Sequence, residues 1–161
     1  MFQPLAGVRV IDLTQVLAGP YAAYQLGLMG AEVLKIETPG TGDWARDKGH
    51  LPGLNAEGMG LTYLTQNANK KSVTLNLKTE AGRQVLRRLV QTADVLIENY
   101  RPGAFDALGL GYADLAAINP KLIYCAISAF GSTGPNRELT AYDGVVQAYS
   151  GMMAMTGEPG T

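Results

Sequence analysis

The sequence contains only one cysteine, Cys125, and one histidine, His50, among its 161 residues. One cysteine cannot form a disulfide within the chain, and no local motif supports a zinc site of paired Cys or His ligands. Cys125 lies in the apolar residues 122–127, so we expect it to be buried in a strand. We do not expect it to be a nucleophile, because His50 lies in a polar segment with no partner beside it.

Neither sign of charge dominates the sequence. It has 13 Lys and Arg residues against 14 Asp and Glu residues, a net charge of −1, and the basic residues are scattered. We therefore expect no binding to nucleic acid or to an anionic membrane. Residues 1–5 lack a charged leader pattern, and glycines or charges interrupt every apolar stretch well before the roughly 18 residues of a membrane span. These features predict a cytoplasmic protein, with a mitochondrial or peroxisomal location left open for a eukaryotic source.

The start of the chain has the pattern of a βαβ unit. Residues 8–13 read as a short strand, and the apolar stretch at residues 21–29 is long enough for a helix. Pro20 suits the first helical turn, and Gly30 can end the helix. Residues 32–37 then form a second strand. Such a unit implies parallel strands joined by a right-handed crossover.

The rest of the chain continues this alternation. Further strands are expected at residues 72–77, 94–98 and 122–128, and further helices at residues 80–91, 112–118 and 141–152. Thr79 is the expected N-cap of the helix after it, and Arg83, Arg87 and Arg88 are expected on the solvent-exposed face of that helix. Residues 38–62, rich in glycine, proline and charge, are expected to form a long loop. The alternation predicts an α/β fold with a doubly wound, Rossmann-like, mostly parallel sheet and helices on both faces.

Several common nucleotide and hydrolase motifs are absent from the sequence. The first βα turn, residues 14–20, has no G-x-G-x-x-G run, and neither a G-x-x-x-x-G-K-[ST] loop nor a G-x-S-x-G elbow occurs elsewhere. In open parallel sheets, ligands bind beyond the carboxyl ends of the strands, which here are residues 14–20, 37–46, 99–103 and 129–140. The residues alone therefore indicate a nucleotide-like ligand on a doubly wound sheet.

Eight blocks of the sequence, in order along the chain, resemble those of a known family. They are residues 12–20 (DLTQVLAGP), 28–37 (LMGAEVLKIE), 39–43 (PGTGD), 69–72 (NKKS), 75–78 (LNLK), 93–103 (ADVLIENYRPG), 128–135 (SAFGSTGP) and 142–148 (YDGVVQA). In this order and spacing they resemble the family III CoA-transferases, also called the CaiB/BaiF group. Members of that family move CoA from an acyl-CoA donor to a free carboxylic acid.

The resemblance also implies which residues contact CoA. They are Leu17, Ala18, Leu75, Asn76, Leu77, Lys78, Asn99, Tyr100 and Arg101. Leu17 and Ala18 would lie against the CoA, and the other two segments would contact its nucleotide end and its phosphates. Lys78 and Arg101 suit this role because ammonium and guanidinium groups neutralise phosphate charge. The alternative left open is that both are ordinary surface charges.

Some positions depart from the family pattern. Thr38 and Ala107 stand where some members carry arginines near the CoA, and Arg46 or Lys70 could compensate. Leu17 stands where oxalate-handling members have a glutamine, which favours an acceptor larger or more apolar than oxalate. The loop around it resembles members that use succinyl-CoA and dicarboxylic acids.

The family mechanism implies a nucleophilic aspartate. Its carboxylate attacks the thioester, passes through a mixed anhydride and an aspartyl-CoA thioester, and then gives CoA to the second acid. The resemblance places this aspartate beyond residue 161, so we expect no catalytic nucleophile in this chain and no activity from it alone. Residues 1–161 are interpreted as the amino-terminal part of the large CoA-binding domain, without its remainder or the smaller domain. The complete protein is expected to be a homodimer that takes an acyl-CoA and a small carboxylic acid as substrates, without a covalently bound cofactor.

Tyr142 and Asp143 are candidate supporting residues. The family keeps a carboxylate at the position of Asp143 near the reacting groups, whereas the alternative is an acid stabilised by the dipole of its own helix. Acyl-CoA racemases of the same superfamily use a histidine as a proton-transfer base at the position of Tyr142, so a transferase is favoured. A racemase and a non-catalytic CoA-binding module stay as alternative hypotheses.

Overall fold

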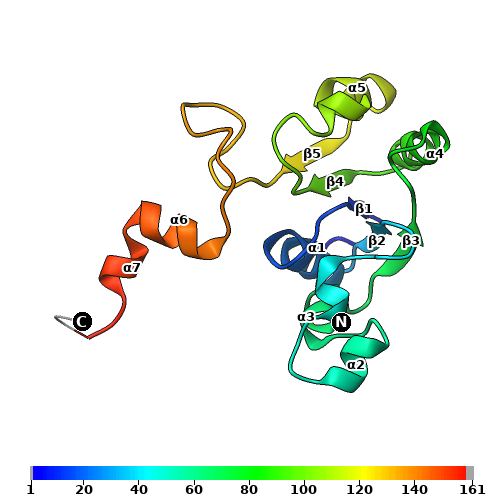
Figure 1. Ribbon diagram of the computed structural model, residues 1–161. Helices are drawn as coiled ribbons and strands as arrows, with labels where there is room; N and C mark the ends of the chain where they lie inside the picture. Colours follow the sequence, from blue (N-terminus) through cyan, green and yellow to red (C-terminus); the bar gives the residue numbers. More distant parts are fainter. Residues whose placement is uncertain (1, 159–161) are drawn as a thin grey trace. The chain divides into compact units, whose positions relative to one another are not determined.

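The computed structural model describes residues 2–158 and contains a five-stranded sheet whose paired strands are all parallel. In chain order, the strands are β1 (Arg9–Asp12), β2 (Glu32–Glu37), β3 (Lys71–Thr74), β4 (Val95–Glu98) and β5 (Ile123–Ala126). Their order in the sheet is β3-β2-β1-β4-β5 (Figure 1). The chain builds from β1 toward β3 and then returns to the other side of β1 for β4 and β5. This arrangement confirms the predicted doubly wound α/β fold.

Five helices and two 3-10 helices connect these strands. They are α1 (Ala18–Leu28), η1 (Trp44–Asp47), α2 (Pro52–Ala56), α3 (Leu61–Asn67), α4 (Glu80–Val90), η2 (Asp106–Leu108) and α5 (Tyr112–Ile118). Contacts of α1 reach β1, β2 and β4, so this helix covers the middle of one face of the sheet. The core on this face contains Val10, Ala23, Ala31, Val33 and Ile97.

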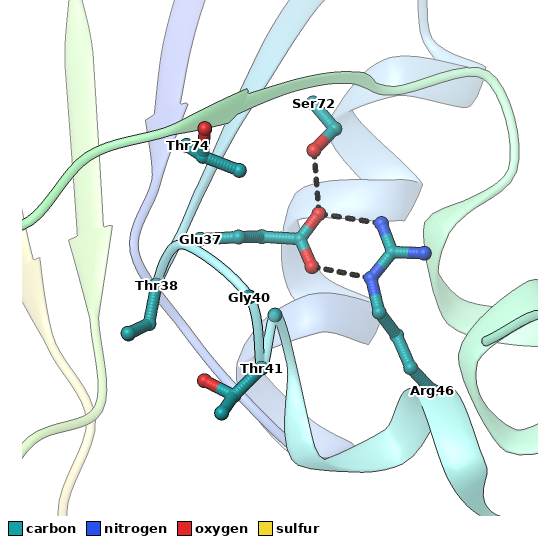
Figure 2. A pocket seen from close by; sticks show the side chains of 8 residues that line it. Glu37, Thr38, Gly40, Thr41, Arg46, Ser72 and Thr74 are labelled. Carbon is teal, nitrogen blue, oxygen red and sulfur yellow. Dashed lines mark hydrogen bonds and ion pairs between the residues drawn. The ribbon is translucent and has the colours of Figure 1, made fainter.

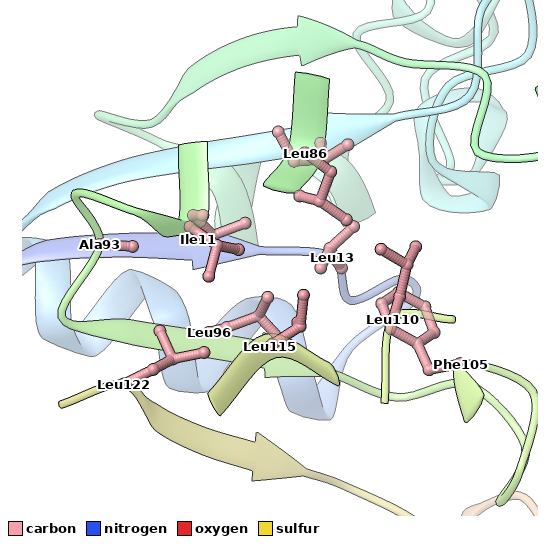
Figure 3. Packing of buried hydrophobic residues seen from close by; sticks show 11 residues of the cluster. Ile11, Leu13, Leu86, Ala93, Leu96, Phe105, Leu110, Leu115 and Leu122 are labelled. Atoms are coloured by element: carbon pink, nitrogen blue, oxygen red, sulfur yellow. The ribbon is translucent and has the colours of Figure 1, made fainter. Parts of the chain in front are cut away.

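The other face of the sheet is covered by α4 and α5. Because successive strand residues point to opposite faces, Ile11 and Leu96 face away from their neighbours Val10 and Ile97. They pack with Leu86 of α4 and Leu115 of α5 (Figure 3). All four of these side chains in the α4/α5 cluster are fully buried. The sheet therefore has a separate apolar core on each face.

Several predicted elements are confirmed. The bounds of β2 and α5 are those expected from the sequence. Thr79 caps α4, because its hydroxyl oxygen accepts a hydrogen bond of 3.2 Å from the backbone N–H of Gly82. The predicted strand at residues 72–77 is shorter, since β3 ends at Thr74 and the chain then turns toward α4.

The prediction of a continuous long loop at residues 38–62 was wrong. This segment contains η1, α2 and the start of α3. The side chain of Asp43 accepts the N–H of Ala45 at the start of η1, and Pro52 opens α2. These elements are short and α2 has no buried residue, so the segment lacks the apolar periodicity by which a helix is recognised in a sequence.

The prediction that Cys125 is buried was also wrong. It is exposed, and so is its neighbour Ile123, at 64%. Within the described part of the chain β5 lies at the edge of the sheet and pairs with β4 alone. An apolar run in the sequence predicts a strand, but the elements packed against it decide how much of it is buried.

The chain divides into two compact units, Met1–Ile127 and Ser128–Thr161. We call the first the sheet unit and the second the C-terminal unit. The C-terminal unit contains α6 (Asp143–Ser150) and α7 (Met152–Met155), where the sequence predicted a single helix. Gly151 separates them, because its φ of +77° lies in the left-handed region and ends α6.

No helix among residues 2–158 combines the length and apolar character needed to cross a membrane.

Candidate functional site

The point where the strand order reverses lies between β1 and β4, and the two segments that leave these strands are bonded to each other. The side-chain amide of Asn99 donates to the backbone oxygen of Gln15 at 2.8 Å, and its oxygen accepts the N–H of Gln15 at 2.9 Å. The N–H of Leu13 also donates to the oxygen of Ile97 at 2.8 Å. In doubly wound folds this switch point is where ligands bind. Asn99 thus fixes the backbone at the centre of the candidate site.

Leu17 and Ala18 lie where the first βα turn enters α1. Leu17 is the N-cap residue of the helix and is 48% exposed, and Ala18 is also exposed. Val16, just before them, has a φ of +74°, which is unusual for a β-branched residue. Gly19 follows, and a side chain there would collide with Thr14. The turn is therefore tightly packed on its inner side and presents Leu17 and Ala18 outward.

Residues Leu75–Lys78 form the turn between β3 and α4. The N–H of Leu75 donates to the backbone oxygen of Glu37 at 2.9 Å, which extends the pairing of β2 and β3. Arg83 donates from its guanidinium to the backbone oxygens of Leu77 and Lys78, at 3.1 and 3.2 Å. Arg83, which we had assigned to the solvent-exposed face of its helix, thus holds this turn in place.

The segment after β4 combines a half-buried aromatic ring with an exposed cation. The ring of Tyr100 packs against Phe105, with centroids 4.9 Å apart. Burial raises the pKa of the Glu98 carboxyl, although hydrogen bonds from the Tyr100 N–H and Tyr124 oppose the change. Arg101 is exposed, and it forms no ion pair within residues 2–158.

The structure brings the three predicted CoA segments to one edge of the sheet. They follow β1, β3 and β4, and the carboxyl ends of parallel strands share an edge. Lys78, like Arg101, is exposed and has no ion-pair partner in the part of the chain that the structure describes. Two uncommitted cations at this edge can therefore meet an anionic ligand.

A shallow hollow lies beside these segments, beyond the carboxyl ends of β2 and β3. Its lining consists of Glu37, Thr38, Gly40, Thr41, Gly42, Arg46, Ser72 and Thr74. Figure 2 shows the Glu37 carboxylate between the Arg46 guanidinium and the Ser72 hydroxyl. Arg46 donates to both oxygens of Glu37, at 2.6 and 2.7 Å. The expectation that Arg46 supplements the phosphate contacts is not supported, because Glu37 already neutralises it.

The surroundings of Glu37 determine its protonation. Burial by itself would raise the pKa of this carboxyl, but hydrogen bonds from Arg46, Ser72 and the N–H of Asp43 outweigh burial and lower the pKa to about 2. Tyr63 also donates to Glu37 at 3.2 Å, and its ring lies 3.9 Å from the Arg46 guanidinium carbon. Burial raises the pKa of the Tyr63 hydroxyl. Glu37 is therefore a fixed anion that organises the hollow.

A buried network of four charged residues, which sequence analysis missed as a group, lies beneath the first turn. Lys35 is paired with Asp43 at 2.8 Å and lies 3.9 Å from Asp12. Lys70 is paired with Asp12 at 2.7 Å. Burial lowers the pKa of Lys70, although Asp12 opposes the change. Lys70, the other residue expected to supplement the phosphate contacts, is thus committed to Asp12.

The sequence did contain a signal of this network. Asp12 and Lys35 are charged residues that each stand between two apolar residues, and both side chains are fully buried. Charges of opposite sign on two strands expected to be parallel neighbours indicate a buried pair. Asp12 and Lys35 are in fact register partners across β1 and β2. The sequence offered no comparable signal for Asp43, because it lies in the segment expected to be a loop.

The other two predicted residues lie in the C-terminal unit. Asp143 is the first residue of α6, and its carboxylate accepts a hydrogen bond of 2.5 Å from the Gln147 side chain. Tyr142 precedes the helix and is 80% exposed. This geometry is that of a helix first-turn acid, and a catalytic role for either residue stays a prediction.

Comparison with known proteins identifies relatives that cover nearly the whole of this chain. The chain is 46% identical over 155 residues to the succinyl-CoA:glutarate CoA-transferase of Homo sapiens, an alignment that covers 96% of this chain and 35% of that protein. It is 47% identical over 156 residues to the acetyl-CoA:oxalate CoA-transferase of Acetobacter aceti, with 97% and 39% covered. A crystal structure of a CaiB/BaiF family protein from Brucella suis matches with a TM-score of 0.90 and 41% identity, over 100% of this chain and 43% of that one.

The chain thus spans well under half the length of these relatives. The family model described as CoA-transferase family III matches residues 5–161, so it includes every segment of the candidate site and both structural units. With this match, the shared fold and identities above 40%, the chain belongs to CoA-transferase family III.

Proposed function

We propose that the protein to which this chain belongs transfers CoA from an acyl-CoA to a free carboxylic acid. The observation that carries the proposal is the gathering of three segments, after β1, β3 and β4, at one sheet edge with Lys78 and Arg101, two exposed cations that form no ion pair among residues 2–158. CoA carries several phosphate charges and a long, largely uncharged arm. In the proposal, the two cations and the turn N–H groups bind the phosphates, and the exposed Leu17 faces the arm near its thioester end.

The proposed chemistry needs a carboxylate nucleophile. An aspartate attacks the acyl-CoA carbonyl, expels CoA as a thiolate and becomes a mixed anhydride. The thiolate then attacks the aspartyl carbonyl, which releases the first acid and leaves an aspartyl-CoA thioester. The second acid takes CoA by the same steps in reverse. We place this aspartate outside residues 1–161 and assign residues 1–161 the role of the CoA-binding part of the large domain.

We propose a dicarboxylic acid and succinyl-CoA as the substrates. Two considerations support them. The human relative is a succinyl-CoA:glutarate CoA-transferase, and the exposed Leu17 is an apolar neighbour for the acceptor. The Acetobacter relative, whose name contains oxalate, is equally similar in sequence, so oxalate belongs in the same assay. We further propose a cytoplasmic homodimer for the complete protein.

Calorimetric titration of the 161-residue chain with CoA and with succinyl-CoA tests the binding part of the proposal. We expect binding to the wild type and an affinity weaker by about tenfold or more in Arg101→Ala, because a hydrogen-bonded charge contact contributes about 1.5–3 kcal/mol. Lys78→Ala should weaken binding to a similar or smaller extent.

Arg88→Ala is the matched control, since Arg88 is an exposed cation on α4. Equal losses in Arg88→Ala and Arg101→Ala would indicate only a general effect of charge and would contradict the proposed site. In the same samples, transfer of CoA between succinate and glutarate by residues 1–161 alone would contradict our placement of the nucleophile.

A further inference from the structure

The first βα turn contains a strained residue at the point where it meets the candidate ligand site. Val16 has a φ of +74°, and a β-branched side chain rarely adopts the left-handed region. Such a conformation persists only where the surroundings enforce it, and it occurs often at functional sites. The next residue, Leu17, is the exposed N-cap of α1 that faces the proposed CoA arm. What holds Val16 therefore decides where Leu17 points.

Asp43 holds Val16 from the loop after β2. One carboxylate oxygen, Oδ1, accepts hydrogen bonds from the N–H of Val16 at 3.2 Å and from the N–H of Ala45 at 2.9 Å. The N–H of Asp43 itself donates to Glu37 at 2.9 Å. Asp43 is only 1% exposed, so water cannot replace these bonds. A single carboxylate thus links the strained turn, η1 and the end of β2.

A buried ammonium group forms an ion pair with the other oxygen of this carboxylate, Oδ2, which accepts no hydrogen bond among the described residues. Nζ of Lys35 lies 2.8 Å from Oδ2 of Asp43 and donates to the backbone oxygen of Thr14 at 2.7 Å. Its side chain is fully buried. Lys35 therefore holds the residue two positions before Val16, and the carboxylate that holds Val16, at the same time.

The β4 side of the turn is fixed independently. Asn99 makes two hydrogen bonds to the backbone of Gln15, as described above. The three consecutive residues before Leu17 are thus held by Lys35, Asn99 and Asp43. A buried ion pair is weak evidence for stability, because apolar residues of similar volume stabilise a core as well or better. The Lys35–Asp43 pair instead contacts the backbone of the strained turn at the edge of the site, which indicates a role in positioning that turn.

We propose that Asp43, fixed by Lys35, is a positioning residue of the acyl-CoA site that holds Val16 in its left-handed conformation and so directs Leu17 and Ala18 toward the ligand. This inference rests on the proposed function for the ligand and on the geometry alone for the turn. It assigns the loop after β2 a role in binding although Asp43 need not touch CoA.

The test compares Asp43→Ala with Asp43→Asn. The alanine variant lacks the acceptor, so the Val16 amide should exchange with deuterium at least tenfold faster than in the wild type, relative to amides of β1, and CoA should bind about tenfold more weakly. The asparagine variant keeps an acceptor oxygen for the Val16 N–H but loses the ion pair with Lys35, so it should restore part of the Val16 protection and bind CoA more tightly than the alanine variant.

Leu115→Ala is the control for lost stability, since this buried side chain of α5 lies in the α4/α5 cluster. It should lower the stability of the chain and leave both the relative Val16 exchange and CoA binding unchanged. Equal weakening of CoA binding in Leu115→Ala and Asp43→Ala would overturn the positioning role, because general destabilisation would then explain both.

A double-mutant cycle with Val16→Gly measures whether Asp43 affects CoA binding through Val16. A residue that only stabilises the fold would show no such coupling. Glycine adopts the left-handed region without strain but does not hold it. Val16→Gly should therefore weaken CoA binding, and Asp43→Ala should add little in that background. If the double variant loses CoA affinity by the product of the two single losses, Asp43 does not act through Val16 and the proposal is wrong. Failure of the wild type to bind CoA would count against the proposed function, whereas unchanged Val16 exchange in Asp43→Ala would count against this inference.

Discussion

The sheet unit and the C-terminal unit differ in how they bury their side chains. The sheet unit contains an apolar cluster on each face and a network of charged residues that are almost fully shielded from water. Among residues 128–158 no residue is buried, and Tyr142, Tyr149 and Met155 are more than 60% exposed. The sheet unit is therefore stabilised by its own core, whereas α6 and α7 do not form a core of their own within the described residues.

The largest expected effect comes from the buried ion pairs of the sheet unit. Lys35→Ala leaves the Asp43 carboxylate buried without its cation and should lower the free energy of unfolding by about 3–5 kcal/mol in urea titrations. The matched change in the C-terminal unit is Arg137→Ala, because Arg137 forms an exposed pair with Glu138. It should cost less than about 0.5 kcal/mol. Similar losses in the two variants would erase the contrast between the units.

The apolar cores should show the same contrast in cavity-forming variants. Leu96 on β4 is fully buried, so Leu96→Ala should cost about 2–5 kcal/mol. Val146 on α6 is 38% exposed, and Val146→Ala should change the free energy of unfolding by less than about 0.5 kcal/mol. Urea unfolding monitored by circular dichroism measures both. A large loss in Val146→Ala would show that α6 packs into a core in solution.

Acid should act on the sheet unit through Glu37. The pKa of this carboxyl falls from 4.5 to about 2 on folding, so its contribution is complete above pH 4.5 and is lost as the pH decreases toward 2. A shift of this size corresponds to about 3 kcal/mol. We expect stability to fall less steeply over this range in Glu37→Gln, as measured by urea titrations at several pH values.

Asp143→Asn serves as the comparison in the C-terminal unit, because Asp143 is exposed at the start of α6. Because this carboxylate is exposed, Asp143→Asn should change the free energy of unfolding at pH 7 by less than about 0.5 kcal/mol. A larger loss at pH 7 in Asp143→Asn than in Glu37→Gln would reverse the contrast between the two units.

The smallest expected effect concerns the caps of two helices. Thr79→Ala removes the side-chain acceptor at the start of α4 and should cost about 1 kcal/mol. No side-chain hydrogen bond caps α6, where Tyr142 is the N-cap residue, so Tyr142→Ala should change stability by only a few tenths of a kcal/mol. Thermal unfolding followed by circular dichroism is sensitive enough to separate the two. Equal shifts would mean that the cap of α4 contributes nothing particular.

Much of the fold could be predicted because local patterns and tertiary structure agree. The strand at Glu32–Glu37 and the helix at Tyr112–Ile118 have apolar periods and end signals that their packing satisfies. Residues 38–62 could not be predicted, since η1 depends on the side chain of Asp43, whose distant partners are Lys35 of β2 and Val16 in the turn after β1. Cys125 was misplaced because an apolar run does not reveal that its strand lies at an edge.

By itself the sequence determined the alternation of strands and helices, the family to which the chain belongs and the three segments that lie beyond the carboxyl ends of their strands. These features depend on local residue patterns, which are present in the sequence itself. Only the tertiary structure decided that Arg46 and Lys70 are committed to Glu37 and Asp12 and that Asp43 reaches Val16. The physical reason is that a buried charge is neutralised by whichever partner the fold brings within about 3 Å. The separation of two residues in the sequence does not determine that distance.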